Sequence, residues 1–180
     1  GKNPPVVHGY ARRAVTRRLA RKAGAVDKAF DSPAAAAEGA DFVVICTPLL
    51  SIAPLAEACA AAMAPGALVT DVGSTKAGLQ RQMAALRIPF VGSHPIAGSE
   101  QTGLESARAD LYRDAVVVIT PPSGSDAVAV SRVAAFWRSV GARPVLMSAR
   151  DHDNLIAATS HLPHLIAFSL ISHFFGFIIG

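Results

Sequence analysis

The strongest constraint on the fold is a regular alternation of short apolar runs with amphipathic helical patterns. Two of the runs, Phe42–Cys46 and Val116–Ile119, are continuously apolar, which is typical of strands covered by helices on both faces. The alternation predicts an α/β fold with a doubly wound, mostly parallel sheet. The predicted strands are Pro5–Tyr10, Asp41–Thr47, Ala67–Asp71, Ile88–Val91, Ala115–Thr120 and Ala142–Met147, and the helices between them are Arg12–Ala23, Ile52–Met63, Lys76–Leu86 and Asp126–Val140.

After Arg150 the pattern changes to a single long helix, from Asp151 to about Leu170. Asp151 or Asp153 is available to cap its N-terminus, and Pro163 is expected to bend it. We therefore expect two regions. Residues 1–149 would form an incomplete nucleotide-binding domain, and residues 150–180 would be the start of a truncated helical domain.

Composition and charge exclude several classes of protein. With 51% hydrophobic residues and a mean hydropathy of +0.36, the chain is not disordered. Residues 1–28 hold eight basic residues and one acidic residue. Most of these lie in one amphipathic segment without interleaved aromatic side chains, which favours a phosphate site or a solvated helix face over nucleic acid. The apolar run over residues 165–180 is shorter than the roughly 20 residues of a membrane helix, so we expect an interface helix and no membrane partner. The absence of a signal-peptide pattern favours the cytoplasm.

Polar groups follow four of the predicted strands, at Tyr10–Arg13, Thr47–Pro48, Asp71–Lys76 and Ser93–Pro95. In a parallel sheet the carboxyl ends of the strands lie at one edge, where ligands bind. We therefore expect the four groups to line one crevice.

The first group bears on the choice of cofactor. A dinucleotide-binding fold that uses NAD normally places an acidic residue after this strand, whereas a 2′-phosphate requires cations. Here Arg12 and Arg13 follow Ala11 and could grip a phosphate by bidentate hydrogen bonds, so NADP is favoured over NAD. Alternatively, both arginines only begin a basic helix face. No G-x-G-x-x-G sequence precedes them, and we expect the pyrophosphate loop with its strand and helix to be missing.

The segment Val91–Glu100 is predicted to be a loop that places His94 among Gly, Pro and Ser residues, six residues before the carboxylate of Glu100. A histidine near a ligand can act as an acid or base, although a simple polar turn would have the same composition. In the segment Asp71–Lys76, Ser74 could cap the next helix or hydrogen-bond a substrate hydroxyl.

His161 and His164 are three residues apart and therefore lie on one helix face. Two histidines at this spacing could bind a metal ion, but the sequence offers no third ligand of a suitable type nearby. We therefore expect no metal site.

Three segments, Asp71–Lys76, Gly92–Glu100 and Asp151–His164, occur in the order and at the intervals of one family. Through them the chain resembles the prephenate/arogenate dehydrogenases of tyrosine biosynthesis over most of its length. The resemblance implies a Rossmann-like fold and an NAD(P)-dependent oxidative decarboxylation of a cyclohexadienol. Hydride would pass to the nicotinamide while the ring carboxylate leaves as CO₂. It also implies a homodimer for the full-length protein.

The resemblance further implies roles for single residues. His94 would draw off the proton of the ring hydroxyl, and Ser74 would contact the same hydroxyl and the nicotinamide. Glu100 would guard the pocket. The expected catalytic residues are thus His94 and Ser74, the substrate-binding residues are Glu100, His161, His164 and Ser93, and the cofactor-binding residues are Arg12, Arg13, Thr47, Pro48 and Ser74.

The tail Phe174–Gly180 departs from the family, whose members continue with a helical region that supplies an arginine for the substrate carboxylate. We therefore expect the 180-residue chain alone to have little dehydrogenase activity. Two other hypotheses stay open. One is a non-catalytic, truncated remnant of the family, and the other is a dehydrogenase of the related 3-hydroxyacid type, which leaves the Ser-His-Pro segment without an explanation.

Overall fold

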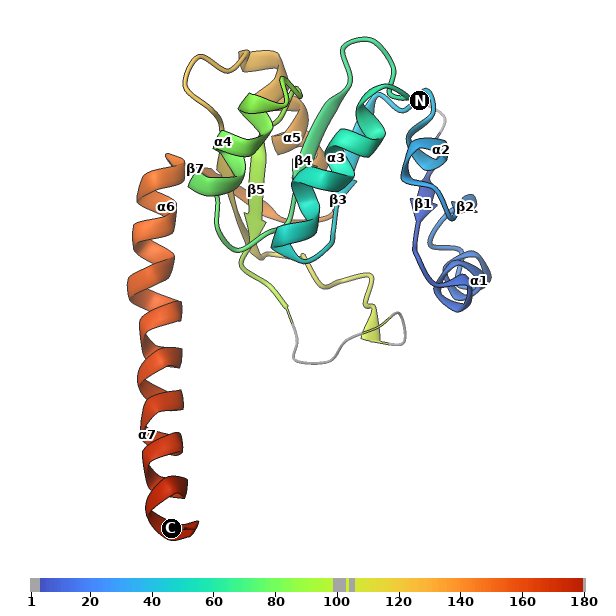
Figure 1. Ribbon diagram of the computed structural model, residues 1–180. Helices are drawn as coiled ribbons and strands as arrows, with labels where there is room; N and C mark the ends of the chain where they lie inside the picture. Colours follow the sequence, from blue (N-terminus) through green and yellow to red (C-terminus); the bar gives the residue numbers. More distant parts are fainter. Residues whose placement is uncertain (1–3, 99–102, 104–105, 180) are drawn as a thin grey trace.

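The computed structural model describes residues 4–98, 103 and 106–179, and within them strands and helices alternate along the chain (Figure 1). The elements, in order, are β1 (His8–Tyr10), α1 (Ala14–Lys22), β2 (Lys28–Phe30), α2 (Pro33–Ala37), β3 (Phe42–Ile45), the 3₁₀ turn η1 (Leu49–Ser51), α3 (Ile52–Ala60), β4 (Leu68–Asp71), α4 (Ala77–Ala85), β5 (Gly92–Pro95), β6 (Val116–Thr120), α5 (Ala127–Ser139), β7 (Arg143–Leu146), α6 (Ala149–Ile156), the π-helical turn η3 (Ala157–His161) and α7 (Leu162–Ile179).

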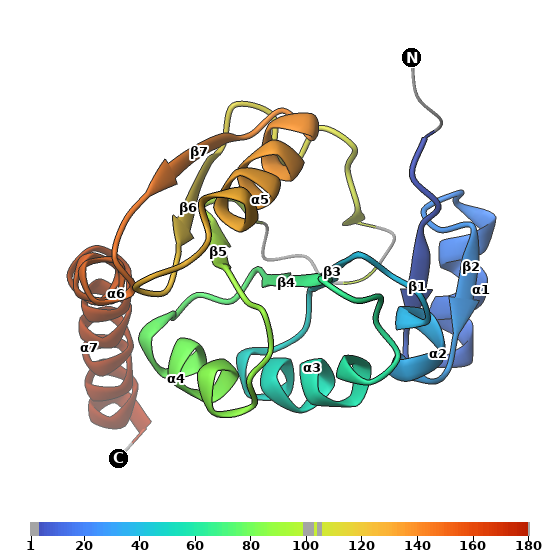
Figure 2. The ribbon, with the colours of Figure 1, turned by 90° about the horizontal axis from the view of Figure 1, so that it is seen from above.

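The strands pair in three groups among the described residues. β1 pairs with β2 and β3 with β4, both in parallel, whereas β6 pairs with β5 in antiparallel and with β7 in parallel orientation. A single parallel bridge from Val69 to Phe90 links β4 to the segment that leads into β5. Figure 2 shows β3 to β7 following one another, with the β1–β2 pair set to one side. The predicted α/β fold with a mostly parallel sheet is thus observed, with one antiparallel pair.

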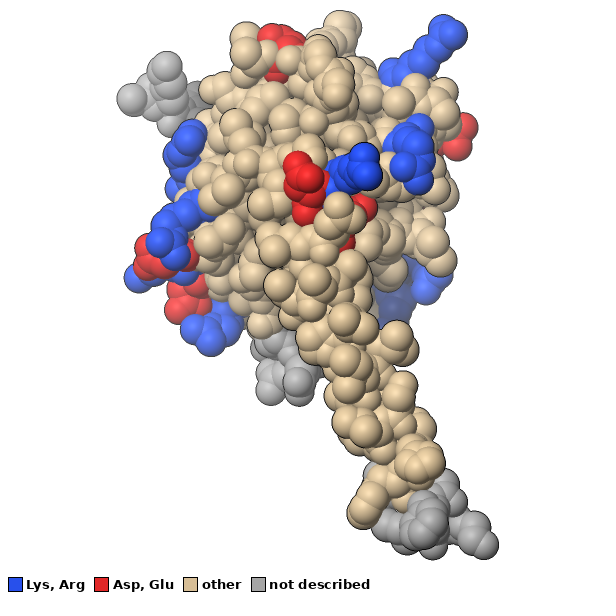
Figure 3. Space-filling model, turned by 90° about the vertical axis from the view of Figure 1, so that its left-hand side faces the viewer, with Lys and Arg blue, Asp and Glu red and all other residues tan. Residues whose placement is uncertain are grey.

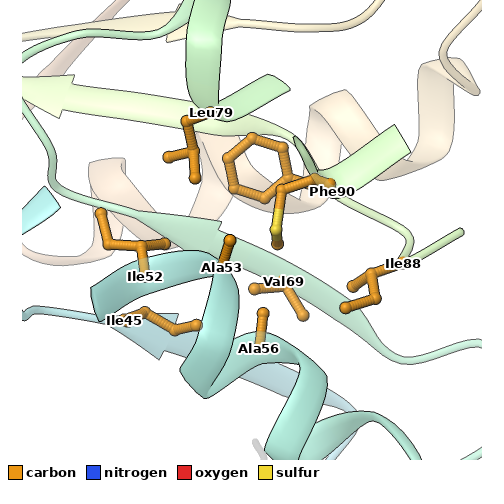
Figure 4. Packing of buried hydrophobic residues seen from close by; sticks show 9 residues of the cluster. Ile45, Ile52, Ala53, Ala56, Val69, Leu79, Ile88 and Phe90 are labelled. Carbon is orange, nitrogen blue, oxygen red and sulfur yellow. The ribbon is translucent and has the colours of Figure 1, made fainter. Parts of the chain in front are cut away.

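Two packed cores lie on opposite faces of the central strands. In β4, Val69 packs against α3 and α4, and its neighbour Leu68 packs against α5 on the other face. Successive strand residues point to opposite faces, so a strand that is apolar throughout can be covered twice. Figure 4 shows the first core, which consists of Ile45, Ile52, Ala53, Ala56, Val69, Leu79, Met83, Ile88 and Phe90.

The structure corrects the predicted loop around His94. The predicted strand Ile88–Val91 forms the single bridge to Val69 of β4. The regular pairing with β6 begins after it, at Gly92. His94 lies in β5, opposite Val118 of β6. Pro89 cannot donate a ladder hydrogen bond, which explains the later start, while the glycine, serine and proline of β5 obscured its strand character.

Two short elements, β2 and α2, were not predicted. They have only three and five residues, too few to show a periodic pattern. A local signal for α2 was present, since Ser32 accepts a hydrogen bond from the Ala35 amide at 3.4 Å and Pro33 opens the helix.

Residues Ala149–Phe174 form one continuous helix. After Asp153 this helix carries no Lys, Arg, Asp or Glu as far as Phe174, and its later part projects from the body of the molecule (Figures 1 and 3). By its length and its mean hydropathy of 1.4 over 18 residues it could cross a membrane, and that window is not buried. A helix that packs on another protein surface meets the same two criteria. The expected interface helix is exposed in this chain, with Phe168 at 70%.

The start and the middle of this helix also differ from expectation. Ser148, rather than Asp151 or Asp153, caps it, and accepts a hydrogen bond from the Asp151 amide at 3.0 Å. Pro163 follows the π-helical turn η3, and the helix continues to Ile179. Proline lacks the N–H of the i−4 bond, and a wider turn accommodates this loss.

Candidate functional site

The turn after β4 is built around a buried ion pair. Asp71 has no exposed surface, Lys76 is 1% exposed, and the Lys76 ammonium contacts Asp71 Oδ2. The carboxylate also accepts the Gly73 amide at 2.8 Å and the Ser93 amide at 3.1 Å. A Cβ on Gly73 would lie 2.9 Å from Asp71 Oδ2 and 3.1 Å from Ile52, so only glycine fits here. Burial lowers the pKa of Lys76, and the nearby Asp71 opposes this shift.

Ser93 is held on several sides by this turn and by the second core. Its hydroxyl donates to the Asp71 carbonyl at 2.7 Å, accepts from the Trp137 indole at 3.0 Å and lies 2.7 Å from the Thr70 hydroxyl. Its carbonyl accepts from Lys76 Nζ at 2.9 Å. The backbone that carries the next residue, His94, is therefore rigidly placed.

His94 is partly buried at the end of β5 and contacts α6. Its Nδ1 lies 2.9 Å from His152 Nε2, and His152 Nδ1 lies 2.8 Å from Asp153 Oδ1. Burial, followed by the nearby His152, Lys76 and His161, lowers the pKa of His94 to about 4, against the opposing effect of Asp153. The imidazole is therefore neutral near pH 7, the form that accepts a proton.

Asp153 joins α6 to the N-terminus of α4. Its two oxygens accept the amides of Lys76 and Ala77, each at 2.8 Å. Burial raises the pKa of Asp153, but hydrogen bonds from Ala77, His152 and Lys76 hold this pKa below its usual value. The alternative in which Ser74 caps this helix is wrong, because the carboxylate of Asp153 takes the first amides.

Two of the four predicted polar groups, the turn of residues 71–76 and the end of β5, therefore meet, and α6 contacts both of them. His152 and Asp153 were not predicted as functional residues, since the sequence indicated no role for His152 and only that of a possible helix cap for Asp153. The only local signal was their position in an Asp-His-Asp motif, which does not show what the motif contacts.

Four of the other predicted site residues follow β3 or lie on the helix after α6. Thr47 and Pro48 follow β3, which pairs with β4, and the Thr47 hydroxyl is buried with no hydrogen-bond partner among the described residues. His161 lies in η3, while His164 is exposed on α7 and bonds to the Ser160 carbonyl at 2.8 Å. The Thr47 hydroxyl is thus available to a ligand.

Ser74 is exposed in the turn, and Arg12 and Arg13 are exposed after β1, in the separate β1–β2 unit. Ser93 is fully buried. Glu100 lies outside the described residues. Of the described residues named in this paragraph, Ser93 contacts the His94 cluster directly.

The lowered pKa of His94 predicts a dependence of stability on pH. Between about pH 6.5, the ordinary histidine pKa, and about pH 4, the unfolded chain binds a proton at this residue and the folded chain does not. The free energy of unfolding should therefore fall as the pH is lowered through this range. Urea unfolding of His94→Asn should show a smaller fall than the native protein. The exposed His173→Asn should match the native slope, and an equal slope in His94→Asn would contradict the assignment.

Comparison with known proteins identifies close similarities. Residues 3–146 match the family model described as prephenate dehydrogenase, nucleotide-binding domain. The chain is 34% identical over 171 residues to cyclohexadienyl dehydrogenase from Zymomonas mobilis, which covers 93% of this chain and 58% of the relative. The chain thus spans little more than half the length of this relative.

Two solved structures show the same similarity. Prephenate dehydrogenase from Aquifex aeolicus, in complex with hydroxyphenyl propionate and NAD⁺, superposes with a TM-score of 0.89 at 31% identity, over 94% of this chain and 60% of that one. Arogenate dehydrogenase from Synechocystis gives a TM-score of 0.84 at 30% identity, over 92% and 59% of the two chains. The predicted Rossmann-like α/β fold is confirmed.

Proposed function

The chain belongs to the prephenate dehydrogenase family, and on this basis we propose that it is part of an enzyme that oxidatively decarboxylates prephenate or arogenate in tyrosine biosynthesis. The observation that carries the proposal is the position of the partly buried His94, which follows Ser93, whose carbonyl accepts from Lys76 in the turn of residues 71–76. This reaction needs a base for the ring hydroxyl next to a site for hydride transfer. The 3-hydroxyacid alternative gives His94 no such task.

In the proposed mechanism His94 accepts the proton of the ring hydroxyl as hydride leaves the carbon that bears it. Ser74, exposed in the turn, hydrogen-bonds the same hydroxyl. The Ser93 hydroxyl is occupied by protein groups, so Ser93 acts by holding His94. Glu100, His161 and His164 complete the substrate site. Loss of CO₂ and aromatisation provide the driving force, and the protein has to orient the substrate and remove the proton.

A nicotinamide cofactor fits the residues after β3. The buried Thr47 hydroxyl lacks a partner within the described chain, and a buried polar group of this kind calls for one. Thr47 and Pro48 would line the cofactor site, where the nicotinamide, when bound, supplies the hydride acceptor. The match to a nucleotide-binding domain supports this placement.

We further propose NADP as the preferred cofactor. Arg17 pairs with Asp31 at 3.8 Å and donates to the carbonyls of Ala11 and Arg12, which places Arg12 and Arg13 beside a structured turn. Their guanidinium groups would bind the 2′-phosphate.

Arg12→Ala is expected to weaken the binding of NADP by about 10- to 100-fold, the loss of one charged hydrogen-bonded contact, and to change NAD binding little. Titration calorimetry with both cofactors measures this. Arg18→Ala, an equally exposed arginine of α1, is the matched control and should leave both affinities near native. Equal weakening of NADP and NAD by Arg12→Ala would show that the arginine is only a surface charge.

The proposal also includes the organisation of the protein. Residues 1–149 would form the nucleotide-binding domain, and residues 150–180 would begin a helical domain. The exposed apolar side chains of α7, such as Leu165 and Phe168, would be covered in a homodimer. The protein would act in the cytoplasm, without nucleic-acid or membrane partners.

The test is an assay of the purified full-length gene product with prephenate and with arogenate, each with NAD and NADP. We expect reduction of the cofactor together with release of CO₂ for at least one substrate, and faster turnover with NADP. Turnover of a 3-hydroxyacid instead would support the related dehydrogenase type, and no turnover with any of these would support a non-catalytic remnant.

A further inference from the structure

Asp153, His152 and His94 form a continuous chain of hydrogen bonds. Asp153 Oδ1 lies 2.8 Å from His152 Nδ1, and His152 Nε2 lies 2.9 Å from His94 Nδ1. His152 has no exposed surface. Each of its ring nitrogens therefore has one protein partner, and the hydrogen positions follow from what these partners can donate or accept.

Asp153 determines which atom donates and which accepts in each of these hydrogen bonds. Its carboxylate already accepts the amides of Lys76 and Ala77 at the start of α4, a position that favours an anion. An ionised carboxylate only accepts hydrogen bonds, so His152 Nδ1 carries a hydrogen. In a neutral imidazole the other nitrogen is an acceptor. His152 Nε2 therefore accepts from His94 Nδ1, and His94 Nε2 keeps its lone pair.

We propose that Asp153 and His152 are positioning residues that hold His94 in the tautomer whose Nε2 is free to accept a proton. This inference rests on the proposed function, in which His94 is the base. When the substrate hydroxyl gives its proton to His94 Nε2, the Nδ1–H bond to His152 strengthens, and the new positive charge is stabilised through that ring by the carboxylate. Second-layer carboxylates orient and tune histidines in this way at other sites.

Within the described part of the chain, the charged and titratable groups that face His94 come from three segments: Lys76 from the turn, His152 and Asp153 from α6, and His161 from η3. Of these, only Asp153 favours a positive charge on His94. Without its negative charge, the hydrogen shared by the two imidazoles would have no preferred direction, because each ring could donate or accept.

The first experiment reads the tautomer directly, by NMR of isotope-labelled histidine nitrogens. We expect His94 to carry its hydrogen on Nδ1, although a free neutral imidazole prefers Nε2. In Asp153→Asn the amide can itself donate to His152, and the His94 hydrogen should move wholly or partly to Nε2. The control Asp151→Asn, on the same helix, alters a carboxylate that contacts Ser148 and should leave His94 unchanged. A native His94 with its hydrogen on Nε2 would overturn the inference.

The second experiment separates this role from the capping of α4. His152→Phe leaves both amide bonds of Asp153 in place and removes the acceptor for His94 Nδ1, whereas Asp153→Asn disturbs those amide bonds. Both variants should lower kcat by about 10- to 100-fold with little change in KM, and neutralising Asp153 should shift the acid limb of kcat/KM to lower pH, because Asp153 raises the pKa of His94. A purely structural role would reduce the thermal midpoint without moving this limb.

A native kcat in His152→Phe would contradict the inference while leaving the proposed function intact. If the native protein turns over neither prephenate nor arogenate, the proposed function fails, and the NMR experiment still decides whether Asp153 and His152 set the tautomer of His94.

Discussion

Asp71→Ala is expected to lower the free energy of unfolding by about 3–5 kcal/mol, the cost of leaving a buried charge without its partner. Lys76 is almost fully enclosed, and without Asp71 its ammonium would keep, among the residues that the structure describes, only the Ser93 carbonyl as a hydrogen-bond partner, at 2.9 Å. The amides of Gly73 and Ser93 would also lose their acceptor. Urea unfolding at neutral pH, followed by circular dichroism, measures the loss.

An exposed ion pair provides the matched control. Arg108 Nε and Asp110 Oδ1 lie 3.0 Å apart on the surface. Asp110→Ala should leave the unfolding midpoint unchanged, because water solvates both charges. The double variant Asp71→Leu with Lys76→Met removes both buried charges and should be more stable than Asp71→Ala. An unfolding midpoint of Asp71→Ala equal to the native one would show that the ion pair does not stabilise the fold.

His94→Asn is expected to lower kcat by about 10²–10⁴-fold, the range for loss of a general base. An asparagine amide can occupy the place of Nδ1 and still donate to His152 Nε2, which is 2.9 Å from Nδ1 in the native protein. No group then replaces Nε2. The variant thus keeps the contact to α6 and loses the proton acceptor, so cofactor affinity should stay native. Initial rates of cofactor reduction by the full-length protein measure the effect.

His173→Asn is the control for this experiment. The residue is exposed on α7, and its substitution should leave kcat at the native value. A native kcat in His94→Asn would remove this histidine from the mechanism. A loss of cofactor affinity as large as the loss of kcat would instead indicate a disturbed nucleotide site.

The strands and helices of the central sheet could be predicted because their signals are local. Phe42–Ile45 and Val116–Thr120 are apolar throughout, and this pattern alone identifies strands covered on both faces. The prediction failed where the local signal was weak or misleading. β2 and α2 were too short, and Gly92–Pro95 resembles a turn in composition although β6 pairs with it over its whole length.

The sequence by itself determined the α/β pattern and the family, and it predicted His94 as the base. These depend on residue types, their periodicity and their order, all of which can be read along the chain. Only the tertiary structure decided what His94 contacts, because His152 lies 58 residues further on and Asp153 reaches the amide of Lys76 across 77 residues. Such contacts depend on how α6 packs against α4. Because of that packing Asp153, which was predicted as a helix cap, hydrogen-bonds to His152, and His152 in turn hydrogen-bonds to His94. No local sequence pattern predicts this arrangement.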